Sequence, residues 1–339
     1  MEKIKVGHIG TKHDHSRAKL EAIRKFPHLF EVVGIVPETP EIAEKIKNDA
    51  VYGGIPIMTE EELFAVPDLK LVLLEGYELE SVAAAQRCID HGLHIHLDKP
   101  GGEDIDAYQK LLADAKRKGL IVQLGYMYRY NPAVNYLDTL IADGRIGEIT
   151  AIDTQMSTQH AAAKVKWLAG FKGGVMFWLG CHLVDLIFRY AGVPEEIIPM
   201  NNRSGFSCPE TYDNTFAIMK YPKFIATIRV NSTEVNGFGR RQLVVCGKEG
   251  TVEIKPLEGP TKMTYADRRH SAAGPYNDLK MDIPFLPPTG RYDVMVKDLY
   301  RYIMGTKENP YSYEYEFQLQ RMVLAACGFD IDFKTPIEL

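Results

Sequence analysis

The 339-residue sequence has few cysteines and no long apolar or basic stretch. Its five cysteines are widely spaced and form no C-x-x-C pair, which argues against structural zinc and predicts reduced thiols in a cytoplasmic protein. No apolar run is long enough to span a bilayer, and the amino terminus enters a predicted strand without the apolar segment of a secretory signal. The formal net charge is -5 and the basic residues are scattered, so the composition favours a small-molecule partner over nucleic acid or an anionic membrane.

Strand-like and helix-like segments alternate through the first third of the chain. Strands are predicted at residues 4–9, 31–36, 69–74, 93–97 and 120–124, with helices at 16–25, 40–48, 81–91 and 105–118. This alternation is typical of βαβ units and predicts a parallel sheet. The pattern changes near Gly125, so a first domain is predicted over residues 1–124 and a second over 125–339.

Strand-like alternation dominates the second predicted domain. After a helix at 132–143, strands are expected at 150–157, 215–221, 224–232, 241–246 and 251–254. Short turns between successive strands favour a mostly antiparallel sheet. The segment 258–290, rich in Pro, Gly and charge, is predicted to be an excursion or lid, and the tail is predicted to be helical at 293–304 and 315–329.

Lys99 is the first candidate for chemistry. It lies in Asp98-Lys99-Pro100, directly after an apolar run, and the proline and the following glycines end that predicted strand. Ligands of open parallel sheets bind beyond the carboxyl ends of the strands. A lysine at this position is therefore expected to face a bound ligand.

The loop after the first predicted strand only partly matches a dinucleotide-binding turn. Against the pattern G-x-G-x-x-G it keeps Gly10, whereas Lys12 and His15 replace the other two glycines. Lys12 either blocks the approach of a pyrophosphate or adds a cation beside it. The place of the loop favours a dinucleotide site over a plain surface turn. The cofactor-binding residues expected there are Gly10, Thr11, Lys12 and His13.

The same loop contains the cluster His13-Asp14-His15, whose two imidazoles are possible metal ligands. Without a clear third ligand, no metal site is predicted.

Glu38 is the candidate for binding the adenosine ribose. An acid commonly has this role at the end of the second strand, and Val36-Pro37-Glu38 places it one residue late. A first-turn carboxylate near a helix that begins at Pro40 explains Glu38 equally well. No Arg or Lys lies between Pro37 and Ala43 to bind a 2′-phosphate, so NAD is preferred to NADP.

A second polar group lies in an apolar segment that begins with two glycines. As a helix, this segment presents four polar side chains on one face: Trp178, His182, Asp185 and Arg189. This stripe either faces water, with Asp185 and Arg189 as an ion pair, or lines a cleft. In a cleft, His182 is suited to be the general base for a hydroxyl proton, with Lys99 polarising or protonating the same oxygen.

Further polar candidates lie between the two predicted domains. Tyr126, Arg129 and Asn131 offer hydrogen-bonding groups suited to a polyhydroxylated ligand, and domain junctions are favoured ligand sites. The tyrosines of this segment fit an aromatic hinge equally well. His94, on an apolar strand, is expected to be a satisfied core residue. His160 is interpreted in the same way, or as a group that reaches the cleft from the end of its strand.

Through an ordered set of motifs the chain resembles the Gfo/Idh/MocA oxidoreductase family. The motifs are Gly10-Thr11, residues 92–100 (similar to G-K-H-V-x-x-E-K-P), Arg129-Tyr130-Asn131-Pro132, Gly144-Arg145-Ile146-Gly147, the segment ending in His182-Leu183-Val184-Asp185, and residues 247–253. The resemblance implies an α/β protein, with an N-terminal Rossmann domain on a doubly wound parallel sheet. An α/β domain with an open, mostly antiparallel sheet follows, and that sheet commonly forms homodimers or homotetramers. The resemblance also implies that Lys99 contacts nicotinamide and substrate, that His182 is the acid/base and that Asp185 binds substrate hydroxyls.

One departure from the family pattern bears directly on the reaction. The family segment reads D-x-G-x-H-x-x-D, and Trp178 stands where the first aspartate belongs, so His182 lacks its expected carboxylate neighbour. An indole at this position is suited to stack on a sugar face or on the nicotinamide ring. The leading hypothesis is an NAD-dependent oxidoreductase acting on a hydroxyl of a sugar, cyclitol or related polyol. The alternatives are an enzyme that retains and recycles NAD during elimination or glycoside cleavage, and a non-catalytic sugar or dinucleotide sensor.

Overall fold

The computed structural model describes residues 2–270, 280–286 and 290–339. The chain divides into two compact units, one comprising Met1–Met127, Thr289–Gln320 and Ile337–Leu339, the other Tyr128–Pro288 and Arg321–Pro336. The first boundary lies close to the predicted one after residue 124. The C-terminal part of the predicted second domain is divided, because residues 289–320 and 337–339 return to the first unit. Within the described residues, no helix has the length and apolar character needed to cross a membrane.

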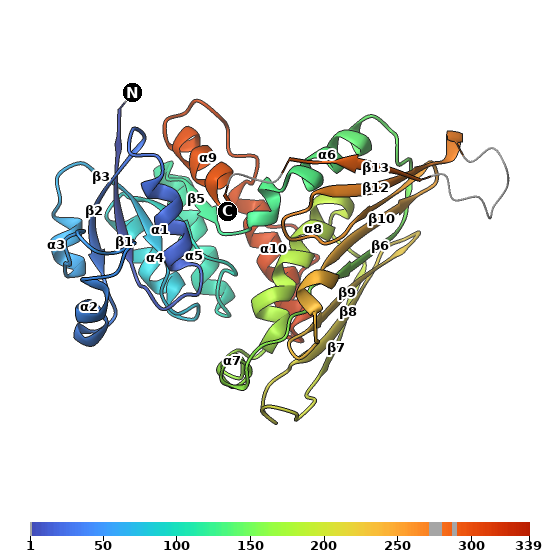
Figure 1. Cartoon of the computed structure of the whole chain (residues 1–339), viewed down its shortest axis with the longest axis horizontal. Coiled ribbons are helices and arrows are strands. Elements are labelled where there is room, and N and C mark those ends of the chain that lie inside the picture. The colour runs from blue at the N-terminus through green and yellow to red at the C-terminus, as the bar shows by residue number, and fades with distance from the viewer. Residues whose placement is uncertain (1, 271–279, 287–289) are drawn as a thin grey trace. The chain divides into compact units, whose positions relative to one another are not determined.

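The first unit contains a five-stranded parallel sheet, ordered β2-β1-β3-β4-β5. Its strands are β1 (Ile4–Ile9), β2 (Phe30–Val36), β3 (Leu69–Leu74), β4 (His94–Leu97) and β5 (Val122–Leu124). Its helices are α1 (Ser16–Arg24), α2 (Pro40–Ile46), α3 (Glu60–Phe64), α4 (Ser81–Asp90), α5 (Ile105–Lys118) and α9 (Asp293–Ile303). Figure 1 shows these elements in blue to cyan, with α9 in red. The predicted Rossmann-type sheet is confirmed, and α3 is the one helix of residues 1–127 that the sequence pattern did not indicate.

The chain order reverses at β1, which lies between β2 and β3. The loops that follow β1 and β3 meet here at two glycines. Gly10 has a φ of 85°, and a Cβ atom at this residue would lie 2.4 Å from the backbone nitrogen of Gly76. This close approach requires glycine at position 10 and explains why one glycine of the turn is kept. Such reversal points are the ligand-binding edges of open α/β sheets.

The second unit contains an eight-stranded sheet, ordered β13-β12-β11-β10-β6-β9-β8-β7. Its strands are β6 (Ile149–Gln155), β7 (Glu196–Asn202), β8 (Asn214–Lys220), β9 (Ile225–Asn231), β10 (Gln242–Gly247), β11 (Gly250–Ile254), β12 (Lys262–Asp267) and β13 (Lys280–Pro284). Among the strands that the structure describes in this sheet, only β6 and β9 pair in parallel, so the predicted mostly antiparallel sheet is confirmed. The helices are α6 (Pro132–Ala142), α7 (Ala162–Leu168), α8 (Cys181–Ala191) and the end of α10 (Tyr313–Ala326).

Helices cover one face of this sheet, and α6 and α8 lie on that side in Figure 1. Inward side chains such as Ala217, Met219 and Ile228 are completely buried. On the opposite face, Ile225 and Met200 are 52% and 56% exposed. The sheet therefore has one packed face and one open face.

The lid predicted at 258–290 is wrong for the described part of that segment. Residues 262–267 and 280–284 form strands β12 and β13 at one edge of the sheet, and Met263 and Tyr265 are almost completely buried. The Pro and Gly residues of the segment lie mainly outside these strands, so its overall composition obscured β12 and the edge strand β13. Positions 271–279 and 287–289 of the predicted lid lie outside the described residues.

Candidate active site

Glu38 accepts hydrogen bonds from the loop that follows β1. Its Oε1 accepts hydrogen bonds from the backbone N–H groups of Thr11 and Lys12, each at 2.8 Å, and its Oε2 accepts from the Thr11 hydroxyl at 2.9 Å. The α2 N-terminus is capped instead by Thr39, whose hydroxyl accepts from Ile42 N–H, so the first-turn interpretation of Glu38 is wrong. Glu38 thus lies at the loop, as expected for a ribose-binding acid.

A cavity of about 540 Å³ lies beside this loop. Apolar side chains including Ile9, Val36 and Leu74 line it together with the polar residues Glu38 and Ser81. An apolar cavity with a few polar groups at the carboxyl ends of β1 and β3 fits the adenosine half of a dinucleotide.

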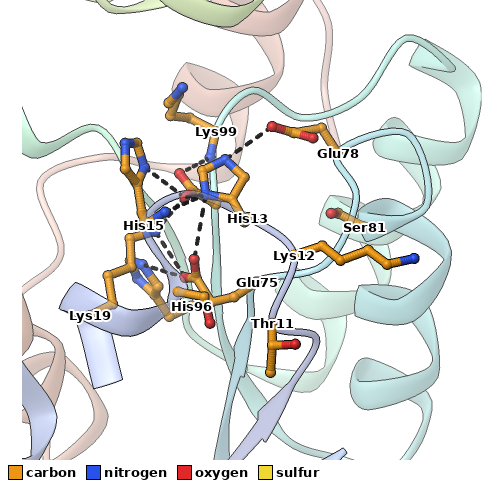
Figure 2. Close-up of polar contacts among 12 residues, drawn as sticks. Thr11, Lys12, His13, His15, Lys19, Glu75, Glu78, Ser81, His96 and Lys99 are labelled. Carbon is orange, nitrogen blue, oxygen red and sulfur yellow. Dashed lines mark hydrogen bonds and ion pairs between the residues drawn. The ribbon is translucent and has the colours of Figure 1, made fainter. Parts of the chain in front are cut away.

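The loop itself offers few backbone donors for a pyrophosphate. The N–H groups of Thr11 and Lys12 are bonded to Glu38, and His13 N–H donates to the Glu75 carbonyl at 3.0 Å. The Lys12 side chain is exposed and extends toward the start of α4, where Ser81 lies (Figure 2). This arrangement favours Lys12 as a cation for a pyrophosphate.

Asp98, at the end of β4, is the centre of a buried polar cluster formed by His13, His15, Lys19, Glu75, Glu78 and Asp98. Its Oδ2 lies 2.8 Å from His13 Nδ1, 3.0 Å from His15 Nδ1 and 2.9 Å from Lys19 Nζ. Figure 2 shows the side chains of His13 and Lys19 converging beside Glu75. The sequence pattern indicated His13 and His15 but not the whole cluster, because the other members come from α1 and from the loops that follow β3 and β4 and meet them only in the folded unit.

The ionisation of this cluster reflects burial and mutual charge. Burial raises the pKa of Glu75 to about 7, although the Lys19 ammonium opposes the shift. Burial lowers the pKa of His15 to about 3. For Asp98, burial acts to raise the pKa, but His13 and Lys19 outweigh it and hold the pKa well below its usual value. Burial acts to lower the pKa of His13, yet Asp98 outweighs it and raises the value to about 9.

Lys99 is completely buried and follows this cluster directly. Its backbone N–H donates to Asp98 Oδ1 at 2.7 Å. The carboxylate that contacts His13 and His15 therefore also restrains the backbone of Lys99. Figure 2 shows the Lys99 side chain extending away from the cluster. A buried lysine at the carboxyl end of β4 has the position that was expected for contact with a ligand.

In the second unit, the segment predicted as one continuous helix begins with a π-helical turn, Met176–Gly180, before α8. The wider turn changes the direction of Trp178 relative to the α8 side chains, so the predicted i, i+4 spacing from Trp178 to His182 does not apply. Both side chains are buried, at 5% and 3% exposure, so the water-facing interpretation of the stripe is wrong. Isolated π turns occur often at functional sites, and this one precedes His182.

Trp178 belongs to an aromatic cluster. Its ring centroid lies 5.8 Å from Trp167 and 5.5 Å from His160. The Lys164 ammonium lies 4.1 Å from the Trp178 centroid and 3.5 Å from that of Trp167. A sugar ring stacking on this side of Trp178 would have to displace Lys164, so stacking by Trp178 and access by His160 stay predictions.

Asp185 and Arg129 form a buried bidentate ion pair, both about 2% exposed. Arg129 Nη2 donates to Oδ1 at 2.8 Å, and Nε donates to Oδ2 at 2.9 Å. Arg189, the ion-pair partner considered for Asp185, donates to Asp138 of α6. Two residues predicted separately to bind substrate therefore bind each other.

His182 packs against Tyr128, with ring centroids 5.1 Å apart and nearly perpendicular planes. The Tyr128 hydroxyl donates to Glu258 Oε2 at 2.5 Å, and Arg241 Nη1 donates to the same oxygen at 3.2 Å. The sequence pattern left Tyr128 between a ligand-binding segment and an aromatic hinge, placed Glu258 in a predicted excursion or lid, and did not indicate Arg241. The only indication in the sequence that Tyr128 belongs to the site was its position next to Arg129.

Two of the remaining candidates have defined surroundings. Asn131 caps α6, accepting from Ala133 N–H at 2.9 Å and donating to the Leu257 carbonyl at 2.9 Å. Tyr126 is 1% exposed in the first unit. Their predicted role in substrate binding stays untested.

Comparison with known proteins identifies both parts of the chain. Residues 4–126 match the model of the oxidoreductase family with an NAD-binding Rossmann fold. Residues 134–253 match the model of the GFO/IDH/MocA C-terminal domain.

Among curated relatives, the trans-1,2-dihydrobenzene-1,2-diol dehydrogenase of Bos taurus is 24% identical over 186 residues, covering 54% of this chain and 52% of the relative. The dTDP-3,4-didehydro-2,6-dideoxy-alpha-D-glucose 3-reductase of Actinomadura kijaniata is 22% identical over 196 residues, covering 58% of each. The chain spans about half the length of the curated relatives it matches.

Solved structures share the fold over the whole chain. Levoglucosan dehydrogenase in complex with NADH and levoglucosan has a TM-score of 0.82 at 15% identity, covering 96% of this chain and 98% of that one. An oxidoreductase of Desulfitobacterium hafniense, provisionally described as NADPH-dependent, has a TM-score of 0.83 at 17% identity, covering 97% and 95%.

Proposed function

Because the chain belongs to the Gfo/Idh/MocA oxidoreductase family, whose first domain is an NAD-binding Rossmann fold, we propose that it dehydrogenates a hydroxyl of a sugar, cyclitol or related polyol. The observation that carries the proposal is Lys99, a completely buried lysine held by Asp98 at the carboxyl end of β4. Relatives named for a diol, a deoxysugar nucleotide and an anhydrosugar support a hydroxylated ring as substrate.

The proposed roles follow from the chemistry of each side chain. Bound NAD would supply the hydride acceptor. Glu38 would bind the adenosine ribose and Lys12 the pyrophosphate. His182 would take the hydroxyl proton of the substrate, and Lys99 would stabilise negative charge that develops during the hydride transfer.

Asp185 has a modified role in this proposal. Both of its oxygens accept hydrogen bonds from Arg129, so we assign substrate binding to the ion pair as a unit, with Asp185 fixing the orientation of the guanidinium. A bidentate partner restrains arginine more firmly than a single hydrogen bond does.

The open face of the eight-stranded sheet is the proposed surface for homodimers or homotetramers. Ile198, Met200 and Ile225 on β7 and β9 are 39%, 56% and 52% exposed. Light scattering after size exclusion tests this assignment: Met200→Glu with Ile225→Lys should dissociate the assembly, and a monomeric wild-type protein would contradict it.

The test of the activity uses reduction of NAD with a panel of polyols and sugars. Lys99→Ala and His182→Ala should each lower kcat by about 100-fold or more, whereas Lys47→Ala, an exposed lysine of an i,i+3 pair, is the matched control. Activity of Lys99→Ala within about 10-fold of wild type would refute the assigned role. Turnover without added NAD and without NADH release would point to cofactor recycling, and failure to bind any dinucleotide would point to a sensor.

A further inference from the structure

Two side chains of the loop after β1 and one at the end of β4 bring together ligand atoms of the types that transition metals bind. Asp98 Oδ2 lies 2.8 Å from His13 Nδ1 and 3.0 Å from His15 Nδ1, and all three atoms lie within 4.8 Å of one another. Two imidazole nitrogens and one carboxylate oxygen suit zinc and its neighbours. Ligand atoms around tetrahedral zinc lie about 3.3 Å apart, so small side-chain shifts would admit the ion.

The hydrogen bonds of His13 show which ring nitrogen faces Asp98 with a lone pair. The backbone N–H of His15 donates to His13 Nδ1 at 3.1 Å, which requires a lone pair on that nitrogen. In a neutral His13 ring the proton would then be on Nε2, which lies 3.1 Å from Glu78 Oε1. Nδ1 and Asp98 Oδ2 face each other across 2.8 Å, a place that a proton occupies when His13 is charged and that a metal ion can occupy after small side-chain shifts.

Glu78 completes the second layer of such a site. Histidines that bind metals usually donate their other ring N–H to a carboxylate, which fixes the tautomer and makes the ligand nitrogen more basic. The contact between His13 Nε2 and Glu78 has this form, and both side chains are buried.

The formal charges of the cluster also fit a divalent ion. Asp98, Glu75 and Glu78 contribute three carboxylates, and Lys19 contributes one ammonium, placed 2.9 Å from both Glu75 Oε1 and Asp98 Oδ2. When a metal ion takes the place of the His13 proton, both imidazoles are neutral, and the three ionised carboxylates and one ammonium leave two formal negative charges beside the ion. Unbalanced buried charge is costly, and one divalent cation neutralises it.

From these observations we propose that His13, His15 and Asp98 bind one divalent transition-metal ion, with Glu78 orienting His13. A proton competes with this ion for the ring nitrogen of His13 that faces Asp98. Entry is available from the side of the loop, because His13 lines a cavity of about 630 Å³ with Thr11, Lys12 and Arg17. The bound ion would tie the loop after β1 to the strand end that carries Lys99.

The experiment measures metal binding to the full chain. Protein stripped with a chelator is titrated with zinc sulfate by calorimetry, and bound zinc is counted by elemental analysis after dialysis. One zinc per chain is expected. His15→Gln should weaken binding by at least about 10-fold and Glu78→Gln by about 10- to 100-fold, whereas His28→Gln, at an exposed histidine outside the cluster, should bind as wild type does.

Cobalt substitution distinguishes this site from incidental binding. Co²⁺ at two histidines and a carboxylate should give a visible absorption band that His15→Gln loses, with circular dichroism confirming that the variant is folded. The proposal is overturned if the wild-type protein binds no zinc, or if a folded His15→Gln binds as tightly as wild type. If His15→Gln does not fold, zinc affinity unchanged in Glu78→Gln overturns it. These readouts do not depend on dehydrogenase activity, so the proposed function stands or fails separately.

Discussion

The ion pair of Arg129 with Asp185 allows a quantitative prediction. Both side chains are about 2% exposed, and the guanidinium donates through Nε and Nη2. Arg129→Met would keep much of the aliphatic volume but leave the Asp185 carboxylate buried without its cation. Removing one partner of a buried pair typically costs about 3–5 kcal/mol, and we expect the free energy of unfolding to fall by this amount.

The assay is urea unfolding of Arg129→Met, Asp185→Leu and the double variant. Because the double variant leaves no unpaired charge, it should be more stable than the sum of the single losses predicts, by about 2 kcal/mol. The control is Lys47→Met, which breaks an exposed pair with Glu44 and should change stability by less than about 0.5 kcal/mol. A loss below about 1 kcal/mol for Arg129→Met, or strictly additive losses, would refute the reasoning.

Three further predictions concern single side chains. Burial lowers the pKa of His8 from 6.5 to about 4, so the contribution of His8 to stability is fully present above pH 6.5 and is lost as the pH falls toward 4. Thermal unfolding at a series of pH values should show that His8→Gln loses less stability in acid than the wild type, by on the order of 3 kcal/mol. The same dependence of stability on pH in both proteins would contradict this. Asn131→Ala removes the α6 cap and should cost about 1 kcal/mol with KM unchanged, so a raised KM at unchanged stability would instead indicate a substrate contact. Glu38→Gln should weaken NAD binding by about 10-fold in calorimetry, whereas Glu44→Gln, at an exposed residue of α2, should not. Equal NAD affinities of Glu38→Gln and the wild type would remove Glu38 from the cofactor site.

The fold could be predicted from the sequence largely because its signals are local. Alternation of apolar strands with amphipathic helices indicated the five-stranded sheet, and Asn131 and Pro132 mark the start of α6 within the chain itself. Strands β12 and β13 were missed because they are short and lie in a segment whose Pro, Gly and charged residues mask their alternation, and β13 is an edge strand with little apolar patterning.

The candidate site was less accessible to sequence reasoning. Lys99, His182 and Asp185 were identified, but the bidentate contact of Asp185 with Arg129, 56 residues away in the sequence, was not. The metal interpretation lacked a third ligand because Asp98 lies 83 positions after His15. The π turn at Met176–Gly180 left no signal in the apolar periodicity. Such contacts depend on tertiary packing, which spacing along the chain does not report.

The central claim is that this chain transfers hydride from a polyol hydroxyl with Lys99 assisting the proton transfer. The most direct measurement is single-turnover reduction of NAD by wild-type and Lys99→Ala protein, monitored by the absorbance of the reduced nicotinamide, with NAD affinity determined separately. The account predicts stoichiometric NADH from the wild type and a rate lower by about 100-fold or more in the variant. Equal rates at equal cofactor occupancy would contradict it.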